Sequence, residues 1–313
     1  MLTFGPVPSR RLGRSLGINN IPPKSCTYSC RYCQVGPTRE TEVAPRLFYK
    51  PVEIFKAVEQ HLTQVKEAGE TVDYLTFVPD GEPTLDLRLS DSIDLLRPLG
   101  IPIAVISNAS LIWRDSVRQT LAKADWVSLK LDAIDDGVWK DINRPHASLN
   151  HESILEGMMR FATEYQGLLV TESMLLQGLN DSDQAARGLA NFLDMLSPKT
   201  AYLSVPTRPP AERDSHAPDE RALNRVYQII HEKFSQLELL TGYEGNAFVS
   251  TGNVAEDLLS ITSVHPMRED AVQSLLARTD IGWKLVEQLL KHRQLIKTEY
   301  GGQIFYVRCL DQG

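Results

Sequence analysis

Two patterns of apolar residues alternate along the first 240 positions of the chain. Short apolar runs, typical of buried strands, are followed by longer segments whose apolar residues recur every three or four positions, as on one face of a helix. The predicted strands cover residues 15–21, 71–78, 101–106, 126–131, 168–176 and 201–205. The predicted helices cover residues 51–68, 87–96, 115–123, 136–142, 151–165, a segment that ends near 196, and 217–234. Residues 4–14, rich in proline and arginine, are expected to form an irregular lead-in.

Strands that alternate with helices at this spacing are typical of parallel βαβ units. The six predicted strands are fewer than the eight of a closed TIM barrel. We therefore predict an α/β fold for residues 1–253, a partial (β/α)6 TIM-like barrel with an open side. Because ligands of such folds bind at the carboxyl ends of the strands, the polar segments that follow the strands should gather at one mouth.

The pattern changes at residue 254. Short amphipathic helices are predicted over residues 255–264, 268–278 and 281–292. Residues 295–300 and 303–307 predict a β-hairpin with Gly301 and Gly302 in its turn. Three helices followed by a hairpin indicate a small α+β winged helix-turn-helix domain over residues 254–313.

Composition places the chain among ordinary globular proteins. Of its 313 residues 42% are hydrophobic and 23% are charged. No apolar run is long enough to span a membrane, and the first residues lack the pattern of a signal peptide. We therefore expect a cytoplasmic protein that does not associate with membranes.

The net charge of −7 argues against a protein that coats nucleic acid. Residues 1–39, however, hold six basic side chains and no acidic one. This segment either receives an anionic ligand or forms a solvated arm. On the first interpretation, Arg10, Arg11 and Arg14 are possible substrate contacts.

Three of the four cysteines, Cys26, Cys30 and Cys33, lie within eight residues. Thiolates this close can hold three irons of an iron–sulfur cluster, whose fourth iron would then lack a cysteine. An open metal site can bind a ligand or take part in chemistry. A structural zinc site with a remote ligand such as His61, or three unligated thiols, are the alternatives. The remaining Cys309 cannot hold a second cluster and is expected to be a simple thiol.

The run Cys26-x-x-x-Cys30-x-Tyr32-Cys33, with a Gly81-Glu82-Pro83 segment after a predicted strand, resembles the radical S-adenosylmethionine (radical SAM) superfamily over residues 10–250. The branch it resembles most is uncharacterised and wyosine-synthase-like. The resemblance implies an enzyme with one 4Fe-4S cluster on the three cysteines and S-adenosylmethionine on the open iron. The reduced cluster would cleave this cofactor to a 5′-deoxyadenosyl radical, which takes hydrogen from a substrate. An electron donor of the flavodoxin or ferredoxin type is also implied.

The resemblance also assigns a cofactor pocket at the strand ends. Glu82 would accept the methionyl ammonium, Lys130 would meet the carboxylate, and Gly178 would allow a close approach of the backbone to the adenine. Ordinary turns and a structural Lys130–Asp132 pair are the alternatives. The full cofactor set is Tyr32, Gly81, Glu82, Pro83, Ser107, Asn108, Lys130, Asp132, Gly178 and Arg208. Further possible substrate contacts are Arg144, His146, Glu172 and Met174.

The substrate remains open, with RNA, a peptide or a protein as candidates, and no catalytic residue is assigned beyond the cluster. One alternative is an activase that places a glycyl radical on a partner protein. A non-enzymatic alternative is an iron–sulfur regulator that senses redox state and binds DNA. Residues 254–313 hold seven basic and eight acidic side chains, which disfavours nucleic acid. A protein or peptide partner is favoured, followed by an intramolecular lid or dimer surface.

Overall fold

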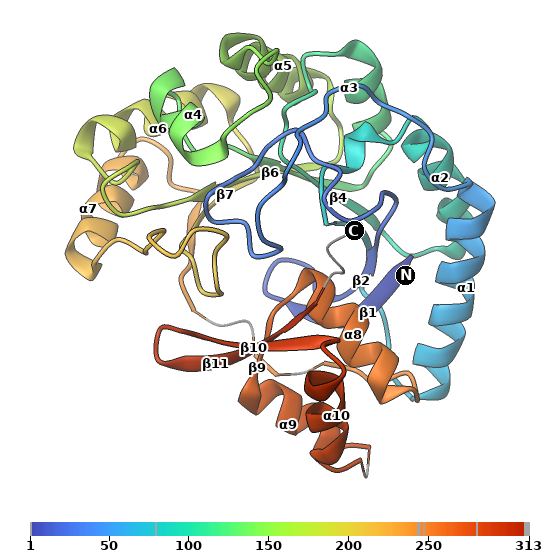
Figure 1. Cartoon of the computed structure of the whole chain (residues 1–313). Coiled ribbons are helices and arrows are strands. Elements are labelled where there is room, and N and C mark those ends of the chain that lie inside the picture. The colour runs from blue at the N-terminus through green and yellow to red at the C-terminus, as the bar shows by residue number, and fades with distance from the viewer. Residues whose placement is uncertain (1, 79, 243–244, 247, 280, 310–313) are drawn as a thin grey trace.

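The computed structural model describes residues 2–78, 80–242, 245–246, 248–279 and 281–309. Its main sheet has eight strands in the order β1-β2-β3-β4-β5-β6-β7-β8. The strands are β1 Thr3–Ser9, β2 Gly13–Ile18, β3 Tyr74–Phe77, β4 Ile103–Ser107, β5 Trp126–Lys130, β6 Leu168–Met174, β7 Thr200–Ser204 and β8 Leu237–Leu240. β1 is antiparallel to β2, and each later pair is parallel. The predicted α/β fold with a parallel sheet is confirmed (Figure 1).

Helices cover the outer face of this sheet (Figure 1). They are α1 Pro51–Glu67, α2 Leu89–Leu96, α3 Asp115–Leu121, α4 Asp136–Asn143, α5 His151–Glu164, α6 Asp183–Leu196 and α7 Glu220–His231, with short 3-10 turns at Pro83–Leu85 and Arg97–Leu99. The local sequence explains where several of these helices begin. Pro51 opens α1, and the side chains of Asn150, Ser182 and Asp219 accept backbone N–H bonds at the starts of α5, α6 and α7.

Two strands of the main sheet were not predicted. Residues 4–14 form most of β1 and the start of β2 rather than an irregular lead-in. Pro6 and Pro8 are compatible with β1 because it is an edge strand, where a missing N–H costs no ladder bond, and the pairing with β2 shifts between Phe4 and Val7. The short β8 escaped notice because its four residues, Leu-Glu-Leu-Leu, do not alternate in hydrophobicity.

The two faces of the sheet have different surroundings. Val127 and Leu129 of β5 pack in the main core against the helices, whereas Trp126 and Lys130 face the barrel interior. An inner apolar cluster fills part of this interior; its buried members are Leu12, Ala104, Trp126, Val170, Tyr202 and Leu240. Polar side chains such as Thr76, Lys130 and Glu172 face the interior beyond this cluster.

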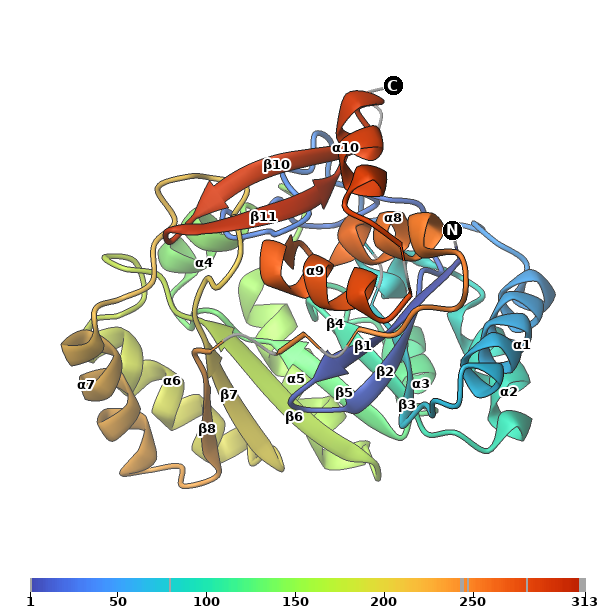
Figure 2. The same ribbon diagram turned by 90° about the horizontal axis from the view of Figure 1, so that it is seen from below.

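The rest of the chain, residues 254–309, is called here the C-terminal segment. It contains α8 Val254–Val264, β9 Met267–Arg268, α9 Glu269–Ala277, α10 Lys284–Lys291, β10 Leu295–Tyr300 and β11 Gln303–Arg308. Its strands pair in the order β10-β11-β9. The segment has a core of its own, which includes Leu258, Ile261, Leu275 and Tyr306, and Val7 of β1 packs against it. Figure 2 shows the segment, in orange and red, beside β1. No helix among the described residues is both long and apolar enough to cross a bilayer.

Candidate functional site

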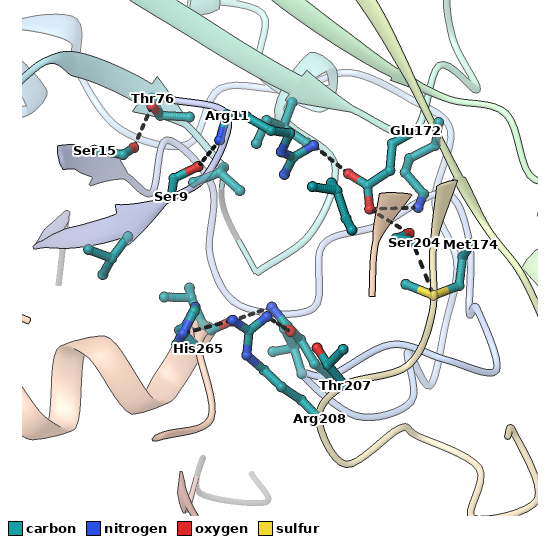
Figure 3. Close-up of a pocket in the computed structure, with 18 of the residues that line it drawn as sticks. Ser9, Arg11, Ser15, Thr76, Glu172, Met174, Ser204, Thr207, Arg208 and His265 are labelled. Atoms are coloured by element: carbon teal, nitrogen blue, oxygen red, sulfur yellow. Dashed lines mark hydrogen bonds and ion pairs between the residues drawn. The ribbon is translucent and has the colours of Figure 1, made fainter. Parts of the chain in front are cut away.

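A cavity of about 350 Å³ lies inside the barrel. Its volume is within the roughly 300–1,000 Å³ range of small-molecule sites. Figure 3 shows Arg11 and Glu172 on one side of it and Arg208 and His265 on another. The predicted site residues that line it are Arg10, Arg11, Tyr32, Cys33, Gly81, Ser107, Asn108, Lys130, Glu172, Met174 and Arg208. The structure therefore brings together residues from the cysteine loop, the β1–β2 turn and the ends of β3, β4, β5, β6 and β7.

The cysteine loop presents its thiols beside amide donors. Asn108 Nδ2 lies 3.6 Å from the sulfur of Cys26, and Asn143 Nδ2 lies 3.5 Å from that of Cys30. Burial raises the pKa of the Cys30 thiol to about 12 and raises that of Cys26 as well. A thiolate buried here is therefore stable only when a positive charge, such as that of a bound metal, lies beside it. Three cysteines this close in the loop, with N–H donors at two of their sulfurs, fit an iron–sulfur cluster.

The zinc alternative that used His61 is wrong. Nδ1 of His61 lies 2.9 Å from Thr3 Oγ1, and Nε2 lies 2.9 Å from the carbonyl oxygen of Gly5. Both ring nitrogens are thus occupied between α1 and β1. No three His, Cys, Asp or Glu side chains of the described residues surround a single ion position. A 4Fe-4S cluster needs no such point, because each cysteine binds a different iron.

The segment after β3 packs directly under the cysteine loop. The Lys24 N–H donates to the carbonyl oxygen of Asp80 at 2.8 Å, and the Glu82 N–H donates to that of Ser25 at 2.9 Å. A Cβ on Gly81 would lie 1.9 Å from the Ser25 oxygen. This close approach of two backbones explains why glycine stands at position 81.

Glu82 is fully buried and already satisfied by protein donors. Its Oε1 accepts from Thr84 and, at 2.8 Å, from Ser107 Oγ, and its Oε2 accepts from the Asn108 N–H at 2.7 Å. Burial raises the pKa of this carboxyl group. Glu82 does not line the cavity, and neither does the buried Pro83. Glu82 therefore orients Ser107 and Asn108, which do.

Replacement of Gly81 by alanine should push the cysteine loop away from the end of β3. We expect a loss of about 1–3 kcal/mol in the free energy of unfolding, typical of overpacking. The iron content after anaerobic reconstitution should fall as well. Gly188→Ala is the matched control, because its Cβ would meet only Ile134 at 3.8 Å within a helix. Equal iron content and stability in the two variants would contradict this account of Gly81.

A cluster of four charges lies beneath the loop. Arg11 Nη1 is 2.5 Å from Glu172 Oε2, and Lys130 Nζ is 3.4 Å from Glu172 Oε1 and 3.5 Å from Asp132 Oδ1. Burial opposes the charge on Lys130, but Asp132 and Glu172 outweigh it and raise its pKa. Burial likewise opposes the charge on Glu172, but Arg11 and Lys130 hold its pKa well below the usual range. Lys130 and Glu172 are therefore both ionised at neutral pH.

Asp132 is the member of this cluster that does not line the cavity. It accepts from the Tyr32 hydroxyl at 2.5 Å, from Asn143 Nδ2 at 2.7 Å and from the Met174 N–H at 2.8 Å. The Lys130 ammonium lies 5.0 Å from the centre of the Tyr32 ring, within the range of a cation–π contact. Asp132 thus orients Tyr32 on the cavity wall, and the structural Lys130–Asp132 pair is present.

Comparison with known proteins identifies the family. The sequence model of the Radical SAM superfamily matches residues 20–189, more than half of the chain. The chain belongs to the radical SAM superfamily. Members of this superfamily use a 4Fe-4S cluster and S-adenosylmethionine, and the chain is an enzyme.

Two relatives match nearly the whole chain. It is 45% identical over 309 residues to UPF0026 protein MJ1312 of Methanocaldococcus jannaschii, across 98% of this chain and 96% of the relative. It is 30% identical over 308 residues to a UPF0026 protein of Helicobacter pylori, across 97% of each. The fold is similar to that of a solved structure of TYW1 with a lysine-pyruvate adduct bound. The TM-score is 0.54 at 16% identity, and the match covers 70% of this chain and 73% of the other.

Two predicted arginines of this radical SAM chain do not line the cavity. Arg14 pairs with Glu70 at 3.3 Å and with Asp73 at 3.7 Å. Arg144 forms an ion pair with Glu212 and ends α4 in the left-handed conformation, with a φ of 44°. Carboxylates of the chain itself thus neutralise these two side chains. Their expected role as substrate contacts finds no support in this placement.

Two other predicted residues also lie off the cavity wall. Gly178 has a φ of 73°, its N–H donates to Asp181 at 2.9 Å, and a Cβ there would meet nothing within 4 Å. The positive φ, rather than a close approach to a neighbour, accounts for this glycine. His146 is partly buried, and its Nδ1 lies 2.8 Å from Ser148 Oγ.

Several residues of the cavity wall were not predicted from the sequence. Ser204 of β7 donates to Glu172 at 3.0 Å, and alternation along a strand that also places Tyr202 inward could have revealed it. Val264 and His265 at the end of α8 line the cavity as well. No sequence signal pointed to them, because the C-terminal segment was interpreted as a separate domain.

Proposed function

We propose that this radical SAM enzyme cleaves S-adenosylmethionine at a 4Fe-4S cluster held by Cys26, Cys30 and Cys33, and that its substrate donates a hydrogen atom inside the barrel. When bound, the cluster and the cofactor supply a 5′-deoxyadenosyl radical. The observation that carries the proposal is the cavity itself. It extends from Cys33 to the charged pair of Arg11 and Glu172, so cofactor and substrate groups can lie side by side.

The chain's residues suit the cofactor end of this cavity. Asn108 and Asn143 donate N–H groups toward two of the sulfurs, which stabilises thiolates over thiols. The contacts of Lys130 with its carboxylate neighbours are 3.4 and 3.5 Å long, so its ammonium has donors left for a shorter bond. We assign Lys130 to the cofactor carboxylate. The ring of Tyr32, oriented through Asp132, is assigned to the adenine.

The opposite end of the cavity suits a substrate. Arg11 Nε is buried and has no hydrogen-bond partner among the described residues. The guanidinium also lies 5.9 Å from the ring of Trp126 and 5.8 Å from that of Tyr202, which limits its movement. We infer that Arg11 and Glu172 bind polar groups of the substrate. A cavity of about 350 Å³ admits only a small molecule or one small group of a larger substrate.

For the C-terminal segment we propose a winged helix-turn-helix domain that begins near residue 254. Its three helices and its three-stranded sheet with a terminal hairpin support this assignment. Its near-neutral charge supports a protein or peptide partner over nucleic acid. The wyosine-synthase-like branch and a flavodoxin or ferredoxin as the electron donor are part of the same proposal.

The test is cofactor cleavage by the whole chain. We expect wild-type protein, reconstituted with iron and sulfide without oxygen, to convert S-adenosylmethionine to methionine and 5′-deoxyadenosine after reduction with dithionite. The two products are measured by liquid chromatography and mass spectrometry. The same protein without dithionite is the control and should form neither. If the reduced protein carries a 4Fe-4S cluster and still forms no 5′-deoxyadenosine, the proposed function is wrong.

A further inference from the structure

The C-terminal segment contributes part of the wall of the radical site. Val264 and His265, at the end of α8, line the same cavity as Cys33. Both are buried, with 6% and 8% of their surface exposed. A segment with a core of its own therefore reaches the site of the proposed cluster.

Four residues join this segment to the cysteine loop, and we call them the latch: Gln34, Arg208, Val264 and His265. Gln34, the residue after Cys33, donates from Nε2 to the carbonyl oxygen of Val264 at 2.8 Å. Its Oε1 accepts from Arg208 Nη1 at 3.1 Å. Arg208 Nη2 lies 2.9 Å from His265 Nε2 (Figure 3). The latch thus connects the cysteine loop, the segment after β7 and the end of α8.

The environment of His265 sets its protonation state. Burial and the neighbouring Arg208 charge hold its pKa well below the usual range, so the ring is neutral. A neutral ring can accept at Nε2 the hydrogen bond that Arg208 donates. The ring of Phe248 packs edge-on against it, with 5.3 Å between the centroids. The side chain at this position is therefore both an acceptor and a packed part of the wall.

We propose that His265 is a positioning residue of the radical site. Through Arg208 and Gln34 it holds the end of the cysteine loop, so that the C-terminal segment keeps the loop closed around the cluster. This inference rests on the proposed function, since it takes Cys33 to be an iron ligand. Without the latch, Gln34, the residue next to Cys33, would lose its hydrogen bonds to Val264 of α8 and to Arg208.

The test compares two replacements of His265 in the whole reconstituted protein. His265→Leu removes the acceptor, whereas His265→Gln keeps one. We expect a chelator to remove iron from the Leu variant about five- to tenfold faster than from wild type, as the loss of one or two hydrogen bonds allows. The Gln variant should restore a rate close to wild type. The measurement is the decay of the cluster absorption under anaerobic conditions, with the EPR spectrum of the reduced cluster as a second readout.

Two further variants make the test decisive. Gln34→Met breaks the latch from the loop side at a partly exposed position, so it serves even if His265→Leu does not fold. Tyr306→Phe is the control, because it removes a 2.9 Å bond to Glu269 within the C-terminal segment and away from the cavity. Iron loss at the wild-type rate in the latch variants would overturn the proposal, as would equally fast loss in Tyr306→Phe. A wild-type protein that takes up no iron would overturn the proposed function too.

Discussion

Replacing Cys30 by alanine should abolish both the iron–sulfur absorption of the reconstituted protein and its formation of 5′-deoxyadenosine. Cys30 is one of three thiols in the loop, and the fourth iron already lacks a cysteine, so no thiol is in reserve. We expect the rate of cofactor cleavage to fall by roughly a thousandfold or more, because the radical chemistry belongs to the bound groups and not to protein side chains. Iron and sulfide analysis and product quantification provide the measurements.

Cys309→Ala is the matched control for this experiment. Cys309 follows β11 in the C-terminal segment, and its N–H donates to the Gln294 carbonyl oxygen at 2.8 Å, a backbone bond that alanine keeps. This variant should bind iron and cleave cofactor as wild type does. If Cys30→Ala forms as much 5′-deoxyadenosine as Cys309→Ala, the cysteine loop does not carry the chemistry.

Local features of the sequence were enough to locate the cysteine loop and the strand ends. Cys26, Cys30 and Cys33 are close in the chain, so their spacing favours an iron–sulfur cluster, with zinc or unligated thiols as the alternatives. Lys130 and Asp132 are two residues apart in a run that is otherwise apolar, and a charge at such a position needs a partner. In both cases the residues that matter are close together in the sequence, so the feature can be recognised before the fold is known.

Contacts between distant segments could not be predicted in this way. Arg11 and Glu172 are 161 positions apart, and only the turn between β1 and β2, itself unpredicted, brings the guanidinium into the barrel. Glu82 was expected to meet a ligand, but the polar groups of Thr84, Ser107 and Asn108 surround it in the folded chain. A charged residue at a strand end can serve either a ligand or its neighbours, and only packing decides which.

Glu172→Gln should destabilise the protein more than any replacement of an exposed carboxylate. The glutamine would leave Arg11 without a counter-charge and Lys130 with Asp132 alone. Loss of one partner from a buried ion pair costs about 3–5 kcal/mol. We expect a loss of that order in the free energy of unfolding at neutral pH, measured by denaturant titration of the cluster-free protein. Glu164→Gln, at the exposed end of α5, is the control and should change stability by less than about 0.5 kcal/mol.

The dependence of this difference on pH identifies its cause. The pKa of Glu172 is far lower in the folded protein than the ordinary value of about 4.3 expected in the unfolded chain. A depressed pKa gives a stabilisation that is complete above that ordinary value and is lost as the pH falls toward the folded pKa. The stability gap between wild type and Glu172→Gln should therefore be constant above about pH 5.5 and narrow on acidification, because Glu172 of the unfolded wild type then takes up a proton that the folded protein does not bind, whereas glutamine does not titrate. A gap that stays constant down to about pH 3 would mean that glutamine fails for reasons of shape, and that the charges of Arg11 and Lys130 are not what holds Glu172 in the barrel.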